Sequence, residues 1–150
     1  MSFPVCLDSW AVLAWLNGEP PGQVLRDTLR WALGDMAAKD ALASLLPMSS
    51  GSPCVSINVV NLGEVSYVLT RRVGEEETSL RIGQMRLLPI NVLPADEKIV
   101  MSAAKTKARH GVSYTDAFAI ASSQSTEGIL MTGDPEIRGV PNLELCYIGR

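Results

Sequence analysis

Short apolar runs alternate with helical segments along the whole chain, and this alternation constrains the fold more than any other feature. Four runs are typical of strands: residues 4–7, 54–57, 90–93 and 129–132. Because helical patterns separate them, consecutive strands need long crossover connections rather than hairpins. The sequence therefore predicts an α/β fold, with a central, mostly parallel sheet of about five strands and helices on both faces.

The intervening segments carry helical spacing and helix caps. They predict helices over residues 10–16, 58–73, 75–88, 96–109 and 113–125, and one long or two short helices over 24–45, where Gly34 is a weak point. The alternating run 143–148 predicts a fifth strand at the edge of the sheet. The serine-rich stretch 48–53 predicts a flexible loop that is too short to separate domains.

Composition indicates an ordinary globular protein. The chain has 150 residues, 47% of them apolar, and a formal net charge of -3, which predicts a single domain over residues 1–150. The apolar run 10–16 is far shorter than the ~20 residues that span a membrane, and no basic residue precedes the first apolar stretch. We therefore expect a cytoplasmic protein with no membrane association.

Cysteine and histidine usage excludes two classes of site. The three cysteines lie far apart, each inside an apolar run, so we expect reduced core residues rather than a disulfide framework or a zinc cluster. The only histidine, His110, stands where a helix should end. A histidine-rich metal site is therefore excluded.

Four acidic residues fall where a parallel sheet binds ligands, in the crevice outside the carboxyl ends of its strands. Asp8 directly follows the first strand, and Asp134 comes two residues after the strand that ends at Thr132. Glu64 interrupts an otherwise apolar helical stripe. Asp116 lies in the first turn of the helix that starts at Ser113, where the helix dipole favours a negative charge.

Each acid also has a simpler interpretation when taken alone. Asp8 and Asp116 could cap helices, and Asp134 before Pro135 could be a turn residue. Glu64 is harder to explain in this way, because a partly buried carboxylate needs a partner. Four converging carboxylates would repel one another unless a cation neutralised them, and oxygen ligands favour Mg²⁺ or Mn²⁺. Such a pocket is typical of phosphate chemistry.

Four motifs give the chain a resemblance to PIN-domain ribonucleases, in particular to the toxin components of VapBC-type toxin-antitoxin systems. The motifs are Leu7-Asp8-Ser9, Asn61-Leu62-Gly63-Glu64-Val65, Tyr114-Thr115-Asp116-Ala117 and Thr132-Gly133-Asp134-Pro135-Glu136. Their order and spacing carry the resemblance, which spans nearly the whole chain. It implies a single PIN-like domain and an endoribonuclease that depends on Mg²⁺ or Mn²⁺.

The resemblance also implies roles for residues and partners. Asp8, Glu64, Asp116 and Asp134 would be the catalytic and metal-binding acids. Ser9 and Thr132 would support the pocket through hydroxyl hydrogen bonds, and Glu136 would be an extra acid. The family further implies an RNA substrate, a cognate antitoxin and a homodimer. The antitoxin would bind near the N-terminal helices, with Trp10, Trp15 and Trp31 as possible anchors, although core positions are the more usual place for such residues.

Two features depart from the family pattern. Ile137 stands where an aromatic residue is frequent, which should affect packing more than chemistry. The stretch 28–53 is longer than in a typical small toxin of this kind, and its helix could alter substrate access or partner docking.

Other functions remain open. The main alternative is a catalytically silent PIN-like binding or regulatory module. A phosphatase or phosphoacceptor domain with Asp8 as nucleophile would require a second aspartate at the position of Trp10. The negative net charge means that RNA binding would have to be local, for example at Lys105 and Arg109, one helical turn apart, although each basic residue taken alone is more typical of a solvated helix face.

Overall fold

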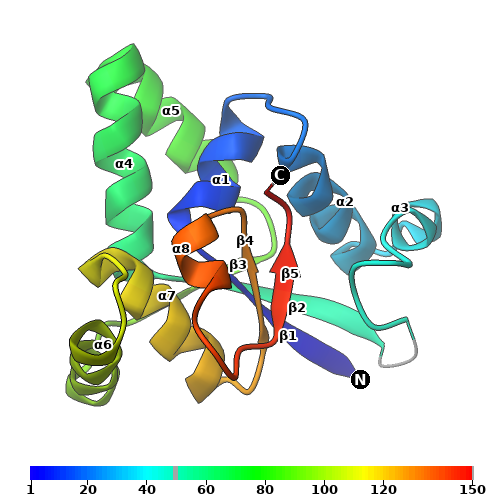
Figure 1. Ribbon diagram of the computed structural model, residues 1–150. Coiled ribbons are helices and arrows are strands. Elements are labelled where there is room, and N and C mark those ends of the chain that lie inside the picture. The colour runs from blue at the N-terminus through cyan, green and yellow to red at the C-terminus, as the bar shows by residue number, and fades with distance from the viewer. Residues whose placement is uncertain (49–50, 150) are drawn as a thin grey trace.

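Five parallel strands form one central sheet in the computed structural model, which describes residues 1–48 and 51–149 (Figure 1). The strands are β1 (Ser2–Leu7), β2 (Ser52–Asn58), β3 (Ile90–Leu93), β4 (Ile129–Thr132) and β5 (Leu145–Tyr147). Their order across the sheet is β3-β2-β1-β4-β5, and every neighbouring pair is parallel. The predicted α/β class, the parallel sheet and the edge position of the last strand are confirmed.

The helices lie close to their predicted positions. They are α1 (Ser9–Leu16), α2 (Gly22–Ala32), α3 (Met36–Ala41), α4 (Val59–Val73), α5 (Glu75–Met85), α6 (Glu97–Arg109), α7 (Tyr114–Ser125) and α8 (Pro135–Arg138). Asn58, Asp96 and Ser113 cap α4, α6 and α7 through side-chain hydrogen bonds. Gly34 adopts a φ of +100°, a conformation that glycine tolerates, so the segment after Pro21 forms two short helices. The short helix α8 was not predicted.

Helices cover both faces of the sheet because successive strand side chains point to opposite sides. Val5 and Leu7 of β1 pack in one core cluster with side chains of α1, α2 and α4, whereas Cys6 packs in a second cluster with α6 and α7. Ile137 of α8 is buried in this second cluster, so the aliphatic residue at this position serves packing. Figure 1 shows α6 and α7 on one side of the sheet and α2 with α3 on the other.

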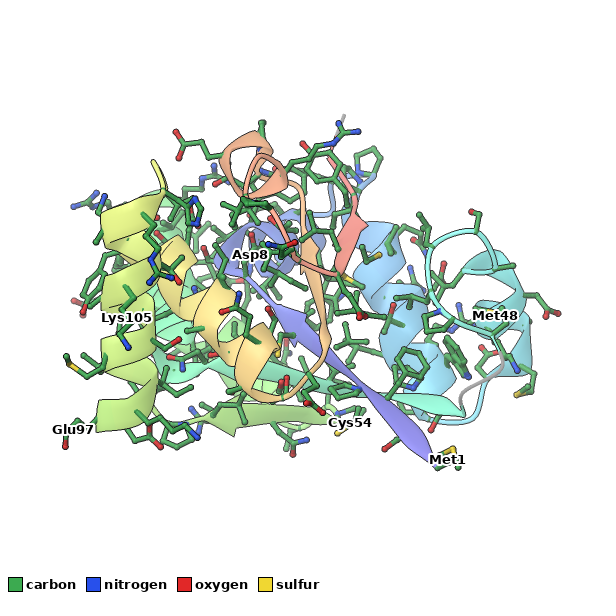
Figure 2. All side chains as sticks on the ribbon, turned by 60° about the horizontal axis from the view of Figure 1, so that its bottom comes forward. Met1, Asp8, Met48, Cys54, Glu97 and Lys105 are labelled. Carbon is green, nitrogen blue, oxygen red and sulfur yellow. The ribbon has the colours of Figure 1, made fainter. Side chains whose placement is uncertain are left out.

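Two expectations need correction. Cys54 is exposed rather than buried, and Figure 2 shows it at the periphery of the molecule. The predicted loop 48–53 is shorter than expected, since β2 already begins at Ser52, where its backbone N–H donates to the Met1 carbonyl. Ser49 and Ser50 of that predicted loop lie outside the described residues.

Among residues 1–48 and 51–149, no helix combines the length and the apolarity needed to cross a membrane.

The contact between α1 and α2 depends on Gly22, and we expect Gly22→Ala to destabilise the protein by about 3 kcal/mol. A Cβ atom at this position would overlap the backbone of Trp15 and lie 2.6 Å from the carbonyl carbon of Ala14. Gly83→Ala in α5 is the matched control, since an added Cβ there meets nothing within 4 Å. The control should be stabilised by up to ~1 kcal/mol, owing to the higher helix propensity of alanine. Urea unfolding of both variants measures the difference, and equal stability of the two would contradict this packing.

Candidate functional site

Asp8 lies at the end of the central strand β1, where its side chain is fully buried. It caps α1: one carboxylate oxygen accepts the backbone N–H of Ala11 at 2.9 Å, and the other accepts the hydroxyl of Thr132. Burial raises the pKa of Asp8 to about 7, although both hydrogen bonds favour the charged form; the charges of Asp116 and Asp134 raise it further. In Figure 2, Asp8 lies near the middle of the molecule.

Asp116 is held in the first turn of α7, which Ser113 caps by accepting the backbone N–H of Asp116 at 3.1 Å. Only 8% of Asp116 is exposed. Burial raises its pKa to about 6, with the charge of Asp134 as the second cause. Neither of the two ion pairs in the described part of the chain includes Asp8, Asp116 or Asp134, so no basic side chain there offsets their charge through an ion pair.

Asp134 and Glu136 bring two further carboxylates to Asp116. Each of the three acids offers a carboxylate oxygen, and these oxygens all lie within 4.8 Å of one another. Asp134 caps α8 by accepting the backbone N–H of Glu136 at 2.9 Å, and its own N–H donates to the Thr132 hydroxyl at 3.0 Å. Thr132 therefore joins Asp134 to Asp8. We call Asp116, Asp134 and Glu136 the acidic cluster.

Glu64 adjoins the acidic cluster from α4, where its charge contributes to the raised pKa of Asp116. Three hydroxyl groups donate to its carboxylate: Ser9 to one oxygen, and Thr115 at 3.0 Å and Tyr67 at 3.4 Å to the other. These donors come from α1, α7 and α4 itself. The side chain is thus fixed in orientation by three helices that meet at this edge of the sheet.

The backbone of α7 is fixed from α4 as well. The side-chain amide of the fully buried Asn61 donates to the Thr115 carbonyl at 2.9 Å. Asn61 lies one helical turn before Glu64 on α4, so this hydrogen bond ties the first turn of α7, which carries Asp116, to the helix that carries Glu64.

All seven residues predicted for the site lie at the carboxyl edge of the sheet, around the point where the strand order reverses between β1 and β4. Glu136, predicted only as an extra acid, belongs to the acidic cluster itself, whereas Asp8 and Glu64 adjoin it. Thr115 and Tyr67 were missed as partners of Glu64. A local signal was present only for Tyr67, which follows Glu64 by one helical turn.

The donor set fits a hard divalent cation. Three carboxylate oxygens within 4.8 Å offer the ligand type that Mg²⁺ and Mn²⁺ prefer. The mutual repulsion that contributes to the raised pKa of Asp116 would be relieved by such an ion.

The sequence profile of the PIN domain matches residues 5–143, which include all of these acids. The chain belongs to the PIN domain family. The predicted resemblance is thereby confirmed at the level of the family, whose members are nucleases that generally use divalent metals. No curated protein sequence matches the chain significantly.

Solved structures share the PIN fold of this chain. DNA-bound VapBC from Salmonella typhimurium is similar with a TM-score of 0.67 and 14% identity, over 97% of this chain and 98% of that chain. VapC20 from Mycobacterium tuberculosis, a sarcin-ricin loop cleaving toxin, gives a TM-score of 0.62 and 19% identity, over 93% and 97%. FitAcB from Neisseria gonorrhoeae gives a TM-score of 0.61 and 14% identity, over 96% of this chain and 97% of that chain. At these identities the likeness concerns the fold.

Proposed function

We propose that this chain is a divalent-metal-dependent endoribonuclease that acts in the cytoplasm as the toxin of a VapBC-type toxin-antitoxin pair. The observation that carries the proposal is the convergence of five carboxylates at the switch point of the sheet: Asp8, Glu64, Asp116, Asp134 and Glu136. The raised pKa values of the two buried aspartates indicate a site built for a cation rather than for structural ion pairs.

Asp116, Asp134 and Glu136 would hold the ion, with Asp8 buried beside them. A divalent cation bound there would supply Lewis acidity, which offsets charge on the phosphoryl oxygens and makes water a better nucleophile. Glu64 would orient the attacking water, because its three hydroxyl partners fix the direction of its carboxylate. Ser9 and Thr132 are positioning residues.

Partners follow from the same proposal. Structures with this fold include a toxin-antitoxin complex from Klebsiella pneumoniae, and VapC20 is described as a toxin that cleaves the sarcin-ricin loop. An RNA substrate, a cognate antitoxin and a homodimer are therefore part of the proposal. Trp31 is buried and cannot anchor an antitoxin, whereas Trp10 and Trp15 remain half-buried on α1.

Cleavage of a mixed pool of structured RNA tests this function. We expect the purified protein to cut RNA in the presence of Mg²⁺ or Mn²⁺. Cleavage should stop when EDTA is added and resume when the metal is restored. Calorimetric titration with Mn²⁺ is run in parallel. If the protein binds Mn²⁺ but leaves RNA intact, it is a catalytically silent PIN-like binding module. If it binds no divalent ion, the proposed metal site is wrong.

A further inference from the structure

The two most exposed aromatic side chains of the chain come from α4 and α7, the helices that carry Glu64 and its partner Thr115. Tyr67 is 48% exposed and Tyr114 is 46% exposed. The other six of the eight aromatic residues are buried or half-buried. Aromatic rings are normally placed where they bury a large apolar area, so two open rings at one edge of the proposed active site need an explanation.

One carboxylate oxygen of Glu64 accepts hydrogen bonds from Tyr67 and from the residue that follows Tyr114. The Tyr67 hydroxyl donates to it at 3.4 Å, and so does Thr115, the neighbour of Tyr114, at 3.0 Å. The Tyr114 ring packs edge-on against Phe118, with 5.0 Å between the ring centroids. The Tyr67 ring is therefore anchored at Glu64, and the Tyr114 ring is fixed on α7, two residues before Asp116.

Arg71 completes the arrangement around Tyr67. Its guanidinium carbon lies 5.3 Å from the centroid of the Tyr67 ring, one helical turn further along α4, and its side chain is exposed. Neither ion pair found among residues 1–48 and 51–149 involves Arg71. The pair therefore offers an aromatic face together with a positive charge that is available to a phosphate.

We propose that Tyr67, with Arg71 and Tyr114, stacks an unpaired nucleobase of RNA beside the acidic cluster. The inference rests on the proposed nuclease function. Aromatic rings and arginine bind single-stranded nucleic acid by stacking on bases without regard to sequence. The net charge of -3 makes this contribution more important, because the chain as a whole does not attract phosphates. Bases within a duplex are already stacked, so the surface selects unpaired nucleotides.

Binding of a short fluorescein-labelled single-stranded RNA tests the proposal, with fluorescence anisotropy as the readout and EDTA present to prevent cleavage. Tyr67→Leu removes the ring but keeps apolar volume, and we expect it to weaken binding roughly 5-fold to 100-fold. Tyr67→Phe restores the ring and should recover most of the lost affinity. Leu87→Ala is the control. Leu87 is 86% exposed and precedes β3, so it lies at the amino edge of the sheet, whereas the site lies at the carboxyl edge.

Cleavage kinetics in Mn²⁺ separate this inference from the nuclease proposal. We expect the effect of Tyr67→Leu to fall mainly on KM, and a labelled duplex to bind more weakly than the single strand. If the wild type cuts RNA and Tyr67→Leu binds it equally well, the stacking surface is wrong while the nuclease function stands. If Tyr67→Phe loses as much affinity as Tyr67→Leu, the hydrogen bond to Glu64 matters and the stacking does not.

Two further results would overturn the inference. If the wild type neither binds nor cuts RNA, both the stacking surface and the nuclease function fail. If the substitutions leave RNA binding unchanged but alter self-association in sedimentation experiments, the tyrosines belong to a protein interface.

Discussion

Asp116→Asn is expected to reduce metal-dependent RNA cleavage by roughly 100-fold to 1,000-fold, the size of loss typical when one preorganised electrostatic group is removed. The substitution keeps the shape of the side chain but removes a charge from the acidic cluster, whose oxygens lie within 4.8 Å of one another. Affinity for Mn²⁺ should fall with it. Initial rates and calorimetric titration measure the two effects.

The folded state should tolerate this change, because Asp116 is buried and repelled by Asp134. Glu144→Gln is the control for the loss of one negative charge. Glu144 directly precedes β5 and therefore lies at the amino edge of the sheet, away from the site. A fully active Asp116→Asn variant, or an equal loss in Glu144→Gln, would contradict the proposed role.

In the metal-free protein, the free energy of unfolding should fall as the pH rises from about 4 to 7. The pKa of Asp8 is about 7 in the folded state and 3.8 in the reference state, so within this window the folded state keeps a proton that the unfolded state releases. Below the window both states are protonated, and above it the full cost of the buried charge is present. The free energy of unfolding should differ by roughly 4 kcal/mol between the two ends of the window. The raised pKa of Asp116 lowers stability in the same direction as the pH rises.

Urea unfolding in EDTA at several pH values measures this dependence. Asp8→Asn resembles the protonated acid, so most of the slope should disappear, and the variant should be more stable than the wild type at pH 8. Excess Mg²⁺ should stabilise the wild type more at pH 8 than at pH 5. A wild type whose stability does not change over this range would show that Asp8 titrates normally.

Helix caps and site acids could be predicted together because the two roles coincide in this fold. Asp8 and Asp134 do cap helices, and the same carboxylates face the site, since helices that follow parallel strands begin at the edge where ligands bind. The two interpretations that the sequence left open are therefore compatible. At Asp116 the cap is Ser113 instead.

Two of the three partners of Glu64, Ser9 and Thr115, could not be predicted from local spacing. An acid in an apolar stripe signals that some partner exists, but Ser9 and Thr115 come from helices 55 and 51 residues away in the sequence. Only the assembled sheet brings them together. The four-residue helix α8 was missed because it is too short to show a helical period. The exposure of Cys54 was missed because an apolar run in the sequence does not show which of its side chains other elements cover.

Pairing of β1 with β4 is the step that completes this arrangement. Leu7 lies opposite Met131, and the hydroxyl of Thr132 reaches back 124 residues to Asp8. During synthesis, the strands and helices up to α7 can leave the ribosome without Asp134 or Glu136, so a nascent chain lacks two of the three clustered carboxylates. The site therefore becomes complete only after β4 and α8 have been made, and a chain truncated before β4 should be inert.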